Sequence, residues 1–453
     1  MKYRYRNEDE LKEISNNNIK LPINWSRGKA QYYFEIFAGG TPSTTREDYW
    51  NGDIPWINSG KVQNCLIYGE SKFITKKGLE ESSTKLIPKD TTVLAMTGAT
   101  CGNVGYLTFD STANQSVMAF CNSKKCDSKY LYYYLMCQND QIEYYKTGGA
   151  QGGINVDNGK KLYINIPSKI EQEKIAKFLD EKTSQFDSII AKKEKLIEKL
   201  EEAKKSLISE VVTGKVKVVK TEAGYKLEER KKEEMKDSGV EWIGTIPKEW
   251  EVKKIKYISD IISKGTTPST IGKDFVNSSE IRFIKAENIS NGNILIKPEF
   301  FIDEETNIIL KRSQLKENDI LFVIAGATIG KNAIVQKEIC PANTNQAISF
   351  IRLKKNINVK FIFFVLNSPR LQESMWLKVV QSAQPNLSME SLGNLFVPYS
   401  NSYDINIITE YIENKVNRLD NIKIFINNQI KKLKEAKQSL ISEAVTGKIE
   451  ILD

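Results

Sequence analysis

Apolar residues recur every seven positions along two long stretches of the chain, residues 171–213 and 405–446. The repeating positions are Leu179, Phe186, Lys193, Leu200 and Leu207 in the first stretch, and Ile412, Leu419, Ile426, Leu433 and Leu440 in the second. A second set, four positions earlier in each heptad, is Ile175, Lys182, Ile189, Leu196 and Ala203, and Ile408, Lys415, Ile422, Gln429 and Ala436. A seam of period 3.5 predicts helices that coil around a partner helix. We expect the two helices to pair with each other, antiparallel, as a rod of ~65 Å.

The regions before each predicted helix carry a different pattern. Short apolar runs such as TTVLAMTG and DILFVIAG are broken by glycine, asparagine and proline, which is typical of buried strands joined by turns. A helical stretch and a short strand ending near Pro167 or Pro398 follow in each region. The pattern predicts an α+β fold with mixed globular domains separated by long helices.

The chain repeats itself. SLISEVVTG at Ser206 returns as SLISEAVTG at Ser439, TPST at Thr41 returns at Thr267, and GATCG at Gly98 returns as GATIG. The spacing between copies increases slowly and in order, as small loop insertions would cause. An antiparallel helix pair would bring the C-terminal copy back to the first domain, and the two termini close together. We predict these segments: a first globular domain 1–166, a helix 167–216, a charged linker 217–240, a second globular domain 241–397 and a helix 398–453.

Composition narrows the possible chemistry. The formal net charge is +9, which suits a polyanionic partner, and histidine is absent. The lack of histidine excludes imidazole-based catalysis and histidine metal centres, and the six cysteines contain no CxxC pair, so we expect no metal site. No segment is apolar enough for a signal peptide or membrane span. These features predict a soluble, intracellular, non-catalytic protein.

Several segments resemble the specificity subunits of type I restriction–modification enzymes. They are DSGVEWIGTIPKEWEVKKI (237–255), the paired GAT-x-G loops and the SLISE-x-VTGK helix ends, and the resemblance covers essentially the whole chain. The N-terminal stretch NNNIKLPINW departs somewhat from the opening of the second half. The resemblance implies a cytoplasmic phage-defence component whose two target-recognition domains each read one half of a split DNA sequence.

The same resemblance implies the partners. They are double-stranded DNA, two methyltransferase (modification) subunits docked on the spacer helices and, through these, restriction and motor subunits. No cofactor is expected in this chain, whereas S-adenosylmethionine, ATP and Mg are expected in the partner subunits. An alternative from another class is a protein-interaction scaffold, or a decoy for methyltransferase subunits, that does not bind DNA. The positive net charge argues against a DNA-mimicking decoy.

Candidate DNA-contacting residues lie in polar, glycine-containing loops that recur in both domains. In the first domain they are Thr41, Ser43, Thr44, Arg46, Lys61, Thr100, Asn103, Asn114, Gln115 and Gln151. In the second they are Thr267, Ser269, Thr270, Lys273, Lys285, Thr328, Lys331, Asn345, Gln346 and Gln384. Amides can read adenine edges bidentately, and hydroxyls and cations can bind phosphates. Turn formation and loop bracing explain many of the same residues. The aromatic run YLYYYL (130–135) is read as a packing face because its counterpart is the apolar FIFFVL (361–366).

Overall fold

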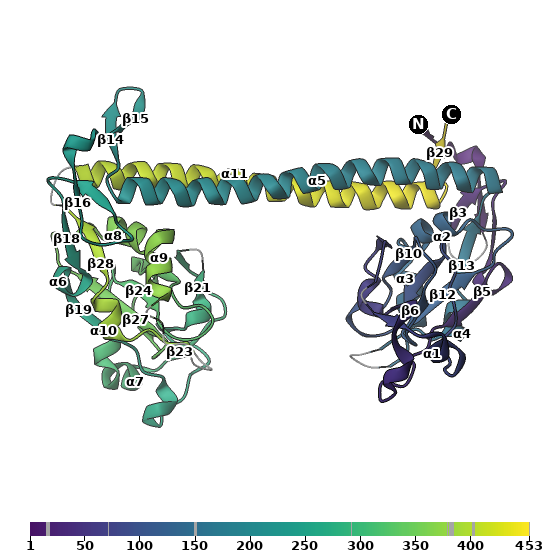
Figure 1. The fold of residues 1–453 in the computed structure, drawn as a ribbon, viewed down its shortest axis with the longest axis horizontal. Coiled ribbons are helices and arrows are strands. Elements are labelled where there is room, and N and C mark those ends of the chain that lie inside the picture. The colour runs from purple at the N-terminus through teal and green to yellow at the C-terminus, as the bar shows by residue number, and fades with distance from the viewer. Residues whose placement is uncertain are drawn as a thin grey trace. The chain divides into compact units, whose positions relative to one another are not determined.

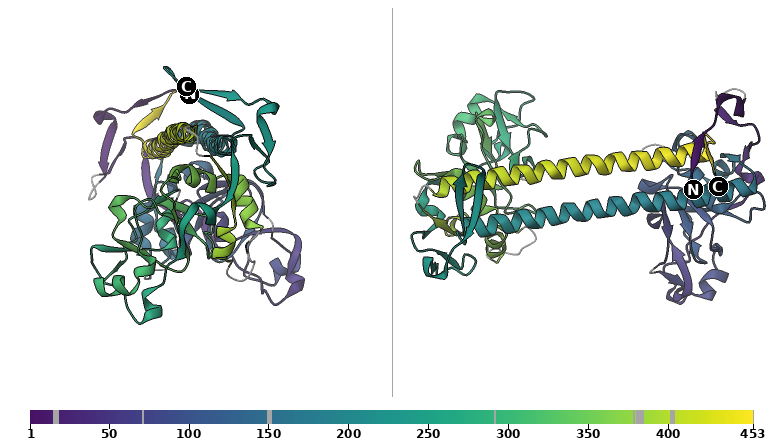
Figure 2. Two further views of the ribbon diagram at one scale, coloured as in Figure 1. Left: turned by 90° about the vertical axis from the view of Figure 1, so that its left-hand side faces the viewer. Right: turned by 90° about the horizontal axis from the view of Figure 1, so that it is seen from above.

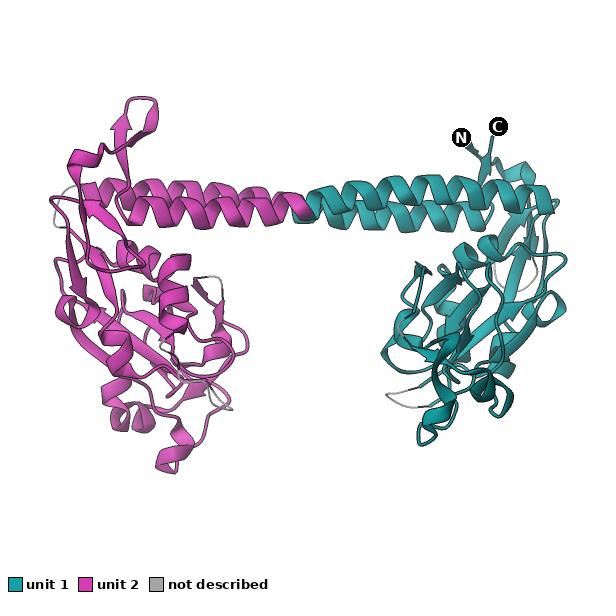
Figure 3. Ribbon diagram, in the orientation of Figure 1, with its two compact units in different colours: residues 1–194, 427–453 teal, residues 195–426 magenta. Residues whose placement is uncertain are grey.

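The computed structural model describes residues 1–14, 19–70, 72–148, 152–290, 292–377, 379, 385–400 and 404–452. It contains two compact units, residues 1–194 with 427–453 and residues 195–426 (Figure 3). The division cuts both long helices, so each unit holds one globular domain and a part of each helix. Among the described residues, no helix has the length and apolar character needed to span a membrane.

Both units are built around a sheet in which four strands have the same order, and unit 1 adds a fifth strand at one edge. In unit 1 the order is β5 (Glu35–Ala38), β12 (Val117–Cys121), β9 (Thr92–Ala95), β10 (Val104–Leu107) and β7 (Cys65–Ile67). In unit 2 it is β19 (Ser259–Lys264), β27 (Ile348–Leu353), β24 (Ile320–Val323) and β25 (Asn332–Ile334). The two domains therefore share one topology, as the repeated motifs predict.

A second small sheet repeats in the same way. In unit 1 it consists of β11 (Thr112–Ala113), β6 (Trp50–Ile57) and β8 (Phe73–Ile74), and in unit 2 of β26 (Ala342–Thr344), β20 (Ile281–Ile284) and β23 (Phe301–Ile302). In each unit the central strand pairs parallel to the short strand that leads into the Asn-Gln turn.

The remaining elements are short. Paired strands are β2 (Leu11–Ile14) with β3 (Ile19–Pro22), β4 (Ser26–Lys29) with β13 (Tyr163–Ile166), β16 (Met235–Asp237) with β17 (Thr245–Pro247), β18 (Glu251–Lys254) with β28 (Phe396–Tyr399), and β21 (Ile289–Ser290) with β22 (Asn293–Ile294). Short helices are α1 (Lys76–Glu80), α2 (Ser128–Leu135), α3 (Asn139–Tyr145), α4 (Val156–Lys160), α6 (Ile255–Ile258), α7 (Glu304–Ile309), α8 (Val359–Leu366), α9 (Pro369–Trp376) and α10 (Met389–Gly393) (Figure 1).

The central strands are apolar throughout because both faces of the sheet are covered. Leu94 and Phe120 belong to the cluster that includes the buried side chains of α2, whereas Val93 and Ala95 belong to a separate cluster on the other face. A strand buried on both faces loses the apolar–polar alternation of a half-exposed strand. This explains why TTVLAM reads as one continuous apolar run.

The long helices are α5 (Lys169–Val212) and α11 (Asp404–Val445), and both end in the same cap. Gly214 and Gly447 adopt positive φ angles of 68° and 78°. The next residue donates back to the helix in each case, from Lys215 N to Glu210 O and from Lys448 N to Glu443 O. These bonds form a Schellman motif, which requires a residue that tolerates the left-handed conformation.

The repeated Pro and Trp positions pack against these helix ends. A Cβ on Gly214 would collide with Pro247 and crowd Trp250, and one on Gly447 would collide with Pro22 and crowd Trp25. Both tryptophans are buried. The recurrence of SLISE-x-VTG together with LPINW and IPKEW therefore reflects one packing unit that occurs in each compact unit.

The two long helices pack against each other, antiparallel, within each unit. In unit 1 Lys437 Nζ lies 2.6 Å from Asp187 Oδ1, and in unit 2 Lys204 Nζ lies 2.8 Å from Asp420 Oδ1. Residue numbers along the contact rise in α5 as they fall in α11, which is the signature of an antiparallel pair. Two views of the ribbon show the helices side by side in each unit (Figure 2). The first heptad set lies along this contact: Leu179, Ile412 and Ile426 are buried, and Phe186, Leu200, Leu207, Leu419, Leu433 and Leu440 are half-buried.

The second heptad set is buried at its first positions, Ile175 and Ile408, but differs from our expectation farther along the helices. Ile189, Leu196 and Ile422 are 44%, 45% and 38% exposed. The inward set follows the first by four positions instead of preceding it: Thr183, Ile190, Ile197, Lys204 and Val211 in α5, and Val416, Lys423, Ile430, Lys437 and Ala444 in α11. Isoleucines flank the first set on both sides, so periodicity alone left the choice open. The structure selects the side whose lysines reach carboxylates on the other helix, while their methylene stems cover the seam.

The chain ends meet in unit 1, in agreement with the prediction from the repeat. Strand β1 (Tyr3–Tyr5) pairs antiparallel with β29 (Ile449–Ile451). In unit 2 the matching strands are β14 (Val216–Thr221) and β15 (Gly224–Glu229), joined as one hairpin. The stretch expected to be a charged linker therefore contains a regular hairpin, since its alternating charged residues lie on exposed strand faces.

Candidate nucleic-acid interface

Two of the repeated loops come together in each domain. Thr41 Oγ1 donates to Gln115 Oε1, and at the equivalent place Thr267 Oγ1 donates to Gln346 Oε1. A Cβ on Gly39 would overlap the backbone oxygen of Ala113, so only glycine permits this approach. Gly265 has the same relation to Thr344 in unit 2. The TPST loop and the Asn-Gln turn, distant in sequence, thus form one surface.

The two amides of the turn have different roles. The Oδ1 atoms of Asn114 and Asn345 each accept a backbone N–H two residues ahead, at 3.2 Å, so both asparagines brace the turn. Gln115 and Gln346 are exposed. Their Oε1 atoms are held by the threonines, and their Nε2 groups donate to no described residue. The glutamines are therefore the amides of the turn whose donors remain available to a ligand.

The GAT-x-G loops lie next to this turn. Met96 N donates to Ser116 O and Ile324 N to Ala347 O, both at 2.8 Å, which links the end of β9 or β24 to the residues after the Asn-Gln turn. The loops have matching glycine conformations, with φ of 71° at Gly98 and 90° at Gly326. We call the TPST loop, the Asn-Gln turn and the GAT-x-G loop of one domain its loop cluster.

The other candidate residues of the loop clusters follow one pattern. Exposed residues are Ser43, Thr44, Ser269, Thr270 and Lys331, and half-buried residues are Thr100, Asn103 and Thr328. Asn103 and Lys331 occupy the same place in the two GAT-x-G loops, where each backbone N–H donates to the threonine carbonyl. Gln151 and Gln384 lie outside the described residues, although the segments that follow them bond to the ends of β9 and β24.

Most of the candidate cations already have partners. Arg46 forms a bidentate pair with Asp48, at 2.9 and 2.8 Å, Lys273 lies 2.7 Å from Glu305, and Lys61 lies 3.7 Å from Glu70. An anion that binds these residues must therefore compete with carboxylates. The pairs of Arg46 and Lys273 are open to solvent, so they contribute little stability and exchange readily, whereas the Glu70 side chain is only 4% exposed.

Lys285 has a different environment. Its ammonium lies 3.4 Å from the ring centroid of Phe300 and 4.5 Å from that of Phe275, a cation–π arrangement that fixes its direction. The paired strands show that Lys285 follows β20 where Asn58 follows β6, so Lys285 and Lys61 are not equivalent. The two domains thus present different groups at one position beside the Asn-Gln turn.

The aromatic run of α2 is a packing face. Tyr130, Tyr133 and Tyr134 are buried, and each hydroxyl has a protein partner, for example Tyr133 to Asp180 at 2.6 Å. Burial raises the pKa of the Tyr133 hydroxyl well above its ordinary value. These rings are not available for base stacking.

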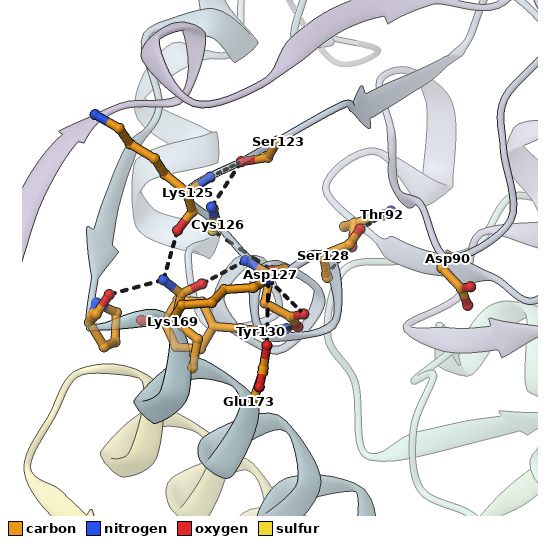
Figure 4. Close-up of polar contacts among 12 residues, drawn as sticks. Asp90, Thr92, Ser123, Lys125, Cys126, Asp127, Ser128, Tyr130, Lys169 and Glu173 are labelled. Carbon is orange, nitrogen blue, oxygen red and sulfur yellow. Dashed lines mark hydrogen bonds and ion pairs between the residues drawn. The ribbon is translucent and has the colours of Figure 1, made fainter.

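A polar network that the heptad pattern does not reveal fixes the start of α5 (Figure 4). Gln172 is fully buried, accepts from Asp127 N at 2.6 Å and donates to the carbonyls of Lys125 and Pro167 at 3.0 Å. Lys169 lies 3.3 Å from Asp127 Oδ2. One turn of helix thus ties α5 to the N-terminus of α2 and fixes its direction relative to the domain of unit 1. In the sequence, the only indication of this network was the polar residue Gln172 at the start of the first heptad stretch, seven positions before Leu179.

Comparison with protein families identifies the fold. The model of the type I restriction modification DNA specificity domain matches residues 22–202 and 247–434, one match for each domain and its helix. The chain belongs to this family. It is the specificity subunit of a type I restriction–modification system, which is non-catalytic, and its two domains are target-recognition domains.

Full-length relatives agree with this assignment of the specificity subunit. This chain is 26% identical over 461 residues to the type I restriction enzyme MjaIX specificity subunit of Methanocaldococcus jannaschii. The match covers 99% of this chain and 98% of the relative. The MjaVIII specificity subunit of the same organism is 23% identical, covering 98% and 97%. A chain solved in a study of type I R-M complex assembly and conformational transition has a TM-score of 0.69 at 12% identity, covering 94% and 99%. That likeness concerns the fold.

Proposed function

We propose that each target-recognition domain reads one half of an asymmetric, two-part DNA sequence through its loop cluster. The observation that carries this proposal is that one scaffold occurs twice with different groups at equivalent places that are at least partly open to solvent. Asn58 corresponds to Lys285, and Asn103 to Lys331. A shared scaffold positions each domain on duplex DNA, whereas different exposed side chains read different bases.

Within each cluster we assign base reading to the glutamines. Gln115 and Gln346 are exposed, and their Nε2 groups donate to no described residue. A bidentate or single amide contact distinguishes base edges in the major groove. The hydroxyls and the cations of the clusters suit phosphates, which set position and make affinity depend on salt. Lys331 is exposed and has no ion pair with a described residue. It can therefore bind a phosphate without first leaving a carboxylate partner, unlike Lys273.

We propose that α5 and α11 set the distance between the half-sites and dock two methyltransferase subunits. The outward flank of the helix pair carries apolar side chains with no cover: Ile189, Leu196, Ile422 and Phe425. Apolar residues at these positions suit burial by a protein partner. The methyltransferases would supply S-adenosylmethionine and flip the target adenine, and the motor subunits would supply the ATP- and Mg-dependent steps.

One experiment tests DNA reading directly. Methylation-sensitive sequencing of the host genome should reveal one adenine motif made of two defined parts and an unread gap. Deletion of the gene for this chain should abolish methylation at that motif. A motif that persists after deletion would contradict the proposal and favour the scaffold alternative, as would a lack of salt-dependent duplex binding by the complex.

A second experiment tests the spacer role. Seven residues inserted after Glu198 in α5, and seven after Phe425 opposite it in α11, preserve the heptad seam and lengthen the helix pair by ~10 Å. The unread gap should grow by about three base pairs at ~3.4 Å each, with both half-sites unchanged. An altered half-site with an unaltered gap would exclude the spacer role.

A further inference from the structure

A cavity of about 250 Å³ lies in unit 2 beside the end of α5 and the start of α9. Its lining includes Lys205, Ser206, Ser209, Glu210, Lys215 and Arg370. The first five belong to the end of α5 and its cap, the segment that is repeated within the chain, and Arg370 is the second residue of α9. The cavity is therefore built by the junction of the spacer helix with the second recognition domain.

The charge in this cavity is strongly positive. Lys205, Lys215 and Arg370 have no ion pair with a described residue. The carboxylate of Glu210 accepts a hydrogen bond from Ser206 Oγ at 3.1 Å, so it is held on its own helix. Burial, followed by the charge of Arg370, lowers the pKa of the Lys215 amine, and the Glu210 carboxylate offsets only part of this effect. An anion placed among these groups would relieve that repulsion.

Unit 1 does not repeat this arrangement. The constant offset of the helices places Gln438 where unit 2 has Lys205, and the offset of the preceding helices places Asn139 where unit 2 has Arg370. Gln438 Nε2 donates to Met136 O at 3.1 Å and is engaged there. A partner that docks identically on both halves would need the site twice. The cavity therefore suits a ligand that meets the two halves differently.

The location of α9 connects the cavity to the loop cluster. Gln372, two residues after Arg370, donates to Gly330 O of the GAT-x-G loop at 3.1 Å. One short helix thus borders both the cavity and the surface that we assign to DNA. An arginine, two lysines and the Ser209 hydroxyl also match the groups that bind phosphates in proteins.

We propose that this cavity binds a backbone phosphate of the DNA duplex and gives the second recognition domain an anchor that the first domain lacks. The inference rests on the proposed function, because it requires duplex DNA at the loop cluster of unit 2. The contact is independent of base identity, so it should strengthen binding without changing the recognised sequence.

The test uses the full chain with its methyltransferase subunits, and a duplex that contains the motif found by sequencing. Affinity is measured at several salt concentrations for the wild type, Arg370→Ala, Lys215→Met and the double variant. Loss of one phosphate contact should reduce the slope of log K against log salt by about 0.9. The control is Lys448→Met, the counterpart of Lys215 in unit 1, which should leave the slope unchanged. Thermal unfolding confirms that each variant is folded.

The outcomes separate the two proposals. If the wild type shows no salt-dependent duplex binding, the proposed function fails and this inference fails with it. If the wild type binds and the double variant has the wild-type slope, only the phosphate anchor is refuted. Titration with inorganic phosphate adds a second measurement. If Arg370→Ala loses phosphate binding but keeps the wild-type salt slope of duplex binding, the cavity binds a free anion and not the DNA backbone. The pair Gln438→Lys and Asn139→Arg, which copies the charges into unit 1, should increase the slope.

Discussion

Glu171 joins three segments of unit 1 that lie far apart in the sequence. Its Oε1 accepts from Arg6 at 2.7 Å, and its Oε2 accepts from Trp25 Nε1 at 3.0 Å. Arg6 also donates to the carbonyls of Gly447 and Ile449, each at 3.1 Å, and its side chain is only 7% exposed. Glu171 thus ties the start of α5 to Trp25 and to Arg6, and Arg6 in turn holds the C-terminal segment.

Unit 2 lacks this connection. Arg230 and Trp250 occupy the places of Arg6 and Trp25, yet among the described residues Arg230 Nε and Trp250 Nε1 have no hydrogen-bond partner. The Arg230 guanidinium lies 3.3 Å from Glu249 instead of pairing with the start of the long helix. The constant helix offset puts Asp404 where unit 1 has Glu171, and aspartate is one methylene shorter. The repeat therefore offers a natural comparison between a complete and an incomplete anchor.

The predicted effect follows from these contacts. Glu171→Gln keeps an acceptor for Trp25 but leaves the Arg6 guanidinium without its carboxylate, which should cost about 2–3 kcal/mol of local stability. Asp404→Asn, the matched control, should cost under ~0.5 kcal/mol, since no described residue bonds to the Asp404 side chain. Asp404→Glu should instead stabilise unit 2 by about 1 kcal/mol, because it supplies the missing acceptor.

Native-state hydrogen exchange measures these changes in each unit separately. The informative amides are those of β1 and β29 in unit 1, and of β14 and β15 in unit 2, because their protection reports opening of the anchored strands. Equal losses from Glu171→Gln and Asp404→Asn would refute the reasoning. So would a stability of Glu171→Gln within ~0.5 kcal/mol of the wild type.

Three other predictions concern single sites. Gly447→Ala should destabilise unit 1 by about 2 kcal/mol or more in thermal unfolding, because alanine is strained at positive φ and its Cβ meets Pro22. Gly98→Ala is the control, because Gly98 has a similar φ but no atom lies within 4 Å of the Cβ that alanine would add. An equal loss of stability in both variants would show that the contact with Pro22 contributes nothing. Gln346→Ala should relax the methylated motif in one half-site only, as read by sequencing, and loss of specificity in both halves would contradict the assignment. The hydrogen bond from Lys423 lowers the pKa of the Glu201 carboxyl in the folded protein. The stabilisation by this ion pair is therefore complete above the unfolded-state pKa of ~4.3, and it is lost as the pH falls through the lower pKa of the folded state. In Lys423→Met, hydrogen-exchange protection of the two long helices should therefore fall less as the pH is lowered than it does in the wild type. An unchanged pH profile would show that the Lys423–Glu201 ion pair is not the origin of this pH dependence.

The sequence determined the features that depend on local pattern. Heptad spacing fixed the two long helices and the residues along the centre of their contact, such as Leu179 and Ile412, because period 3.5 admits one inward stripe. The glycine after each helix marked the cap, and the duplicated motifs implied the meeting of the chain ends that β1 and β29 form. These features need only neighbouring residues or their repetition.

The tertiary structure decided what depends on distant partners. Isoleucines flank the heptad stripe on both sides, and only the packing of the two helices shows which flank is buried. It is the flank whose lysines pair with Asp187, Glu201 and Asp420. The joining of the TPST loop to the Asn-Gln turn, and the distinction between bracing asparagines and outward glutamines, arise from backbone approaches at Gly39 and Gly265. A hydrogen bond or an ion pair depends on where two chain segments come within about 3 Å of each other, and residue types along one segment do not specify that distance.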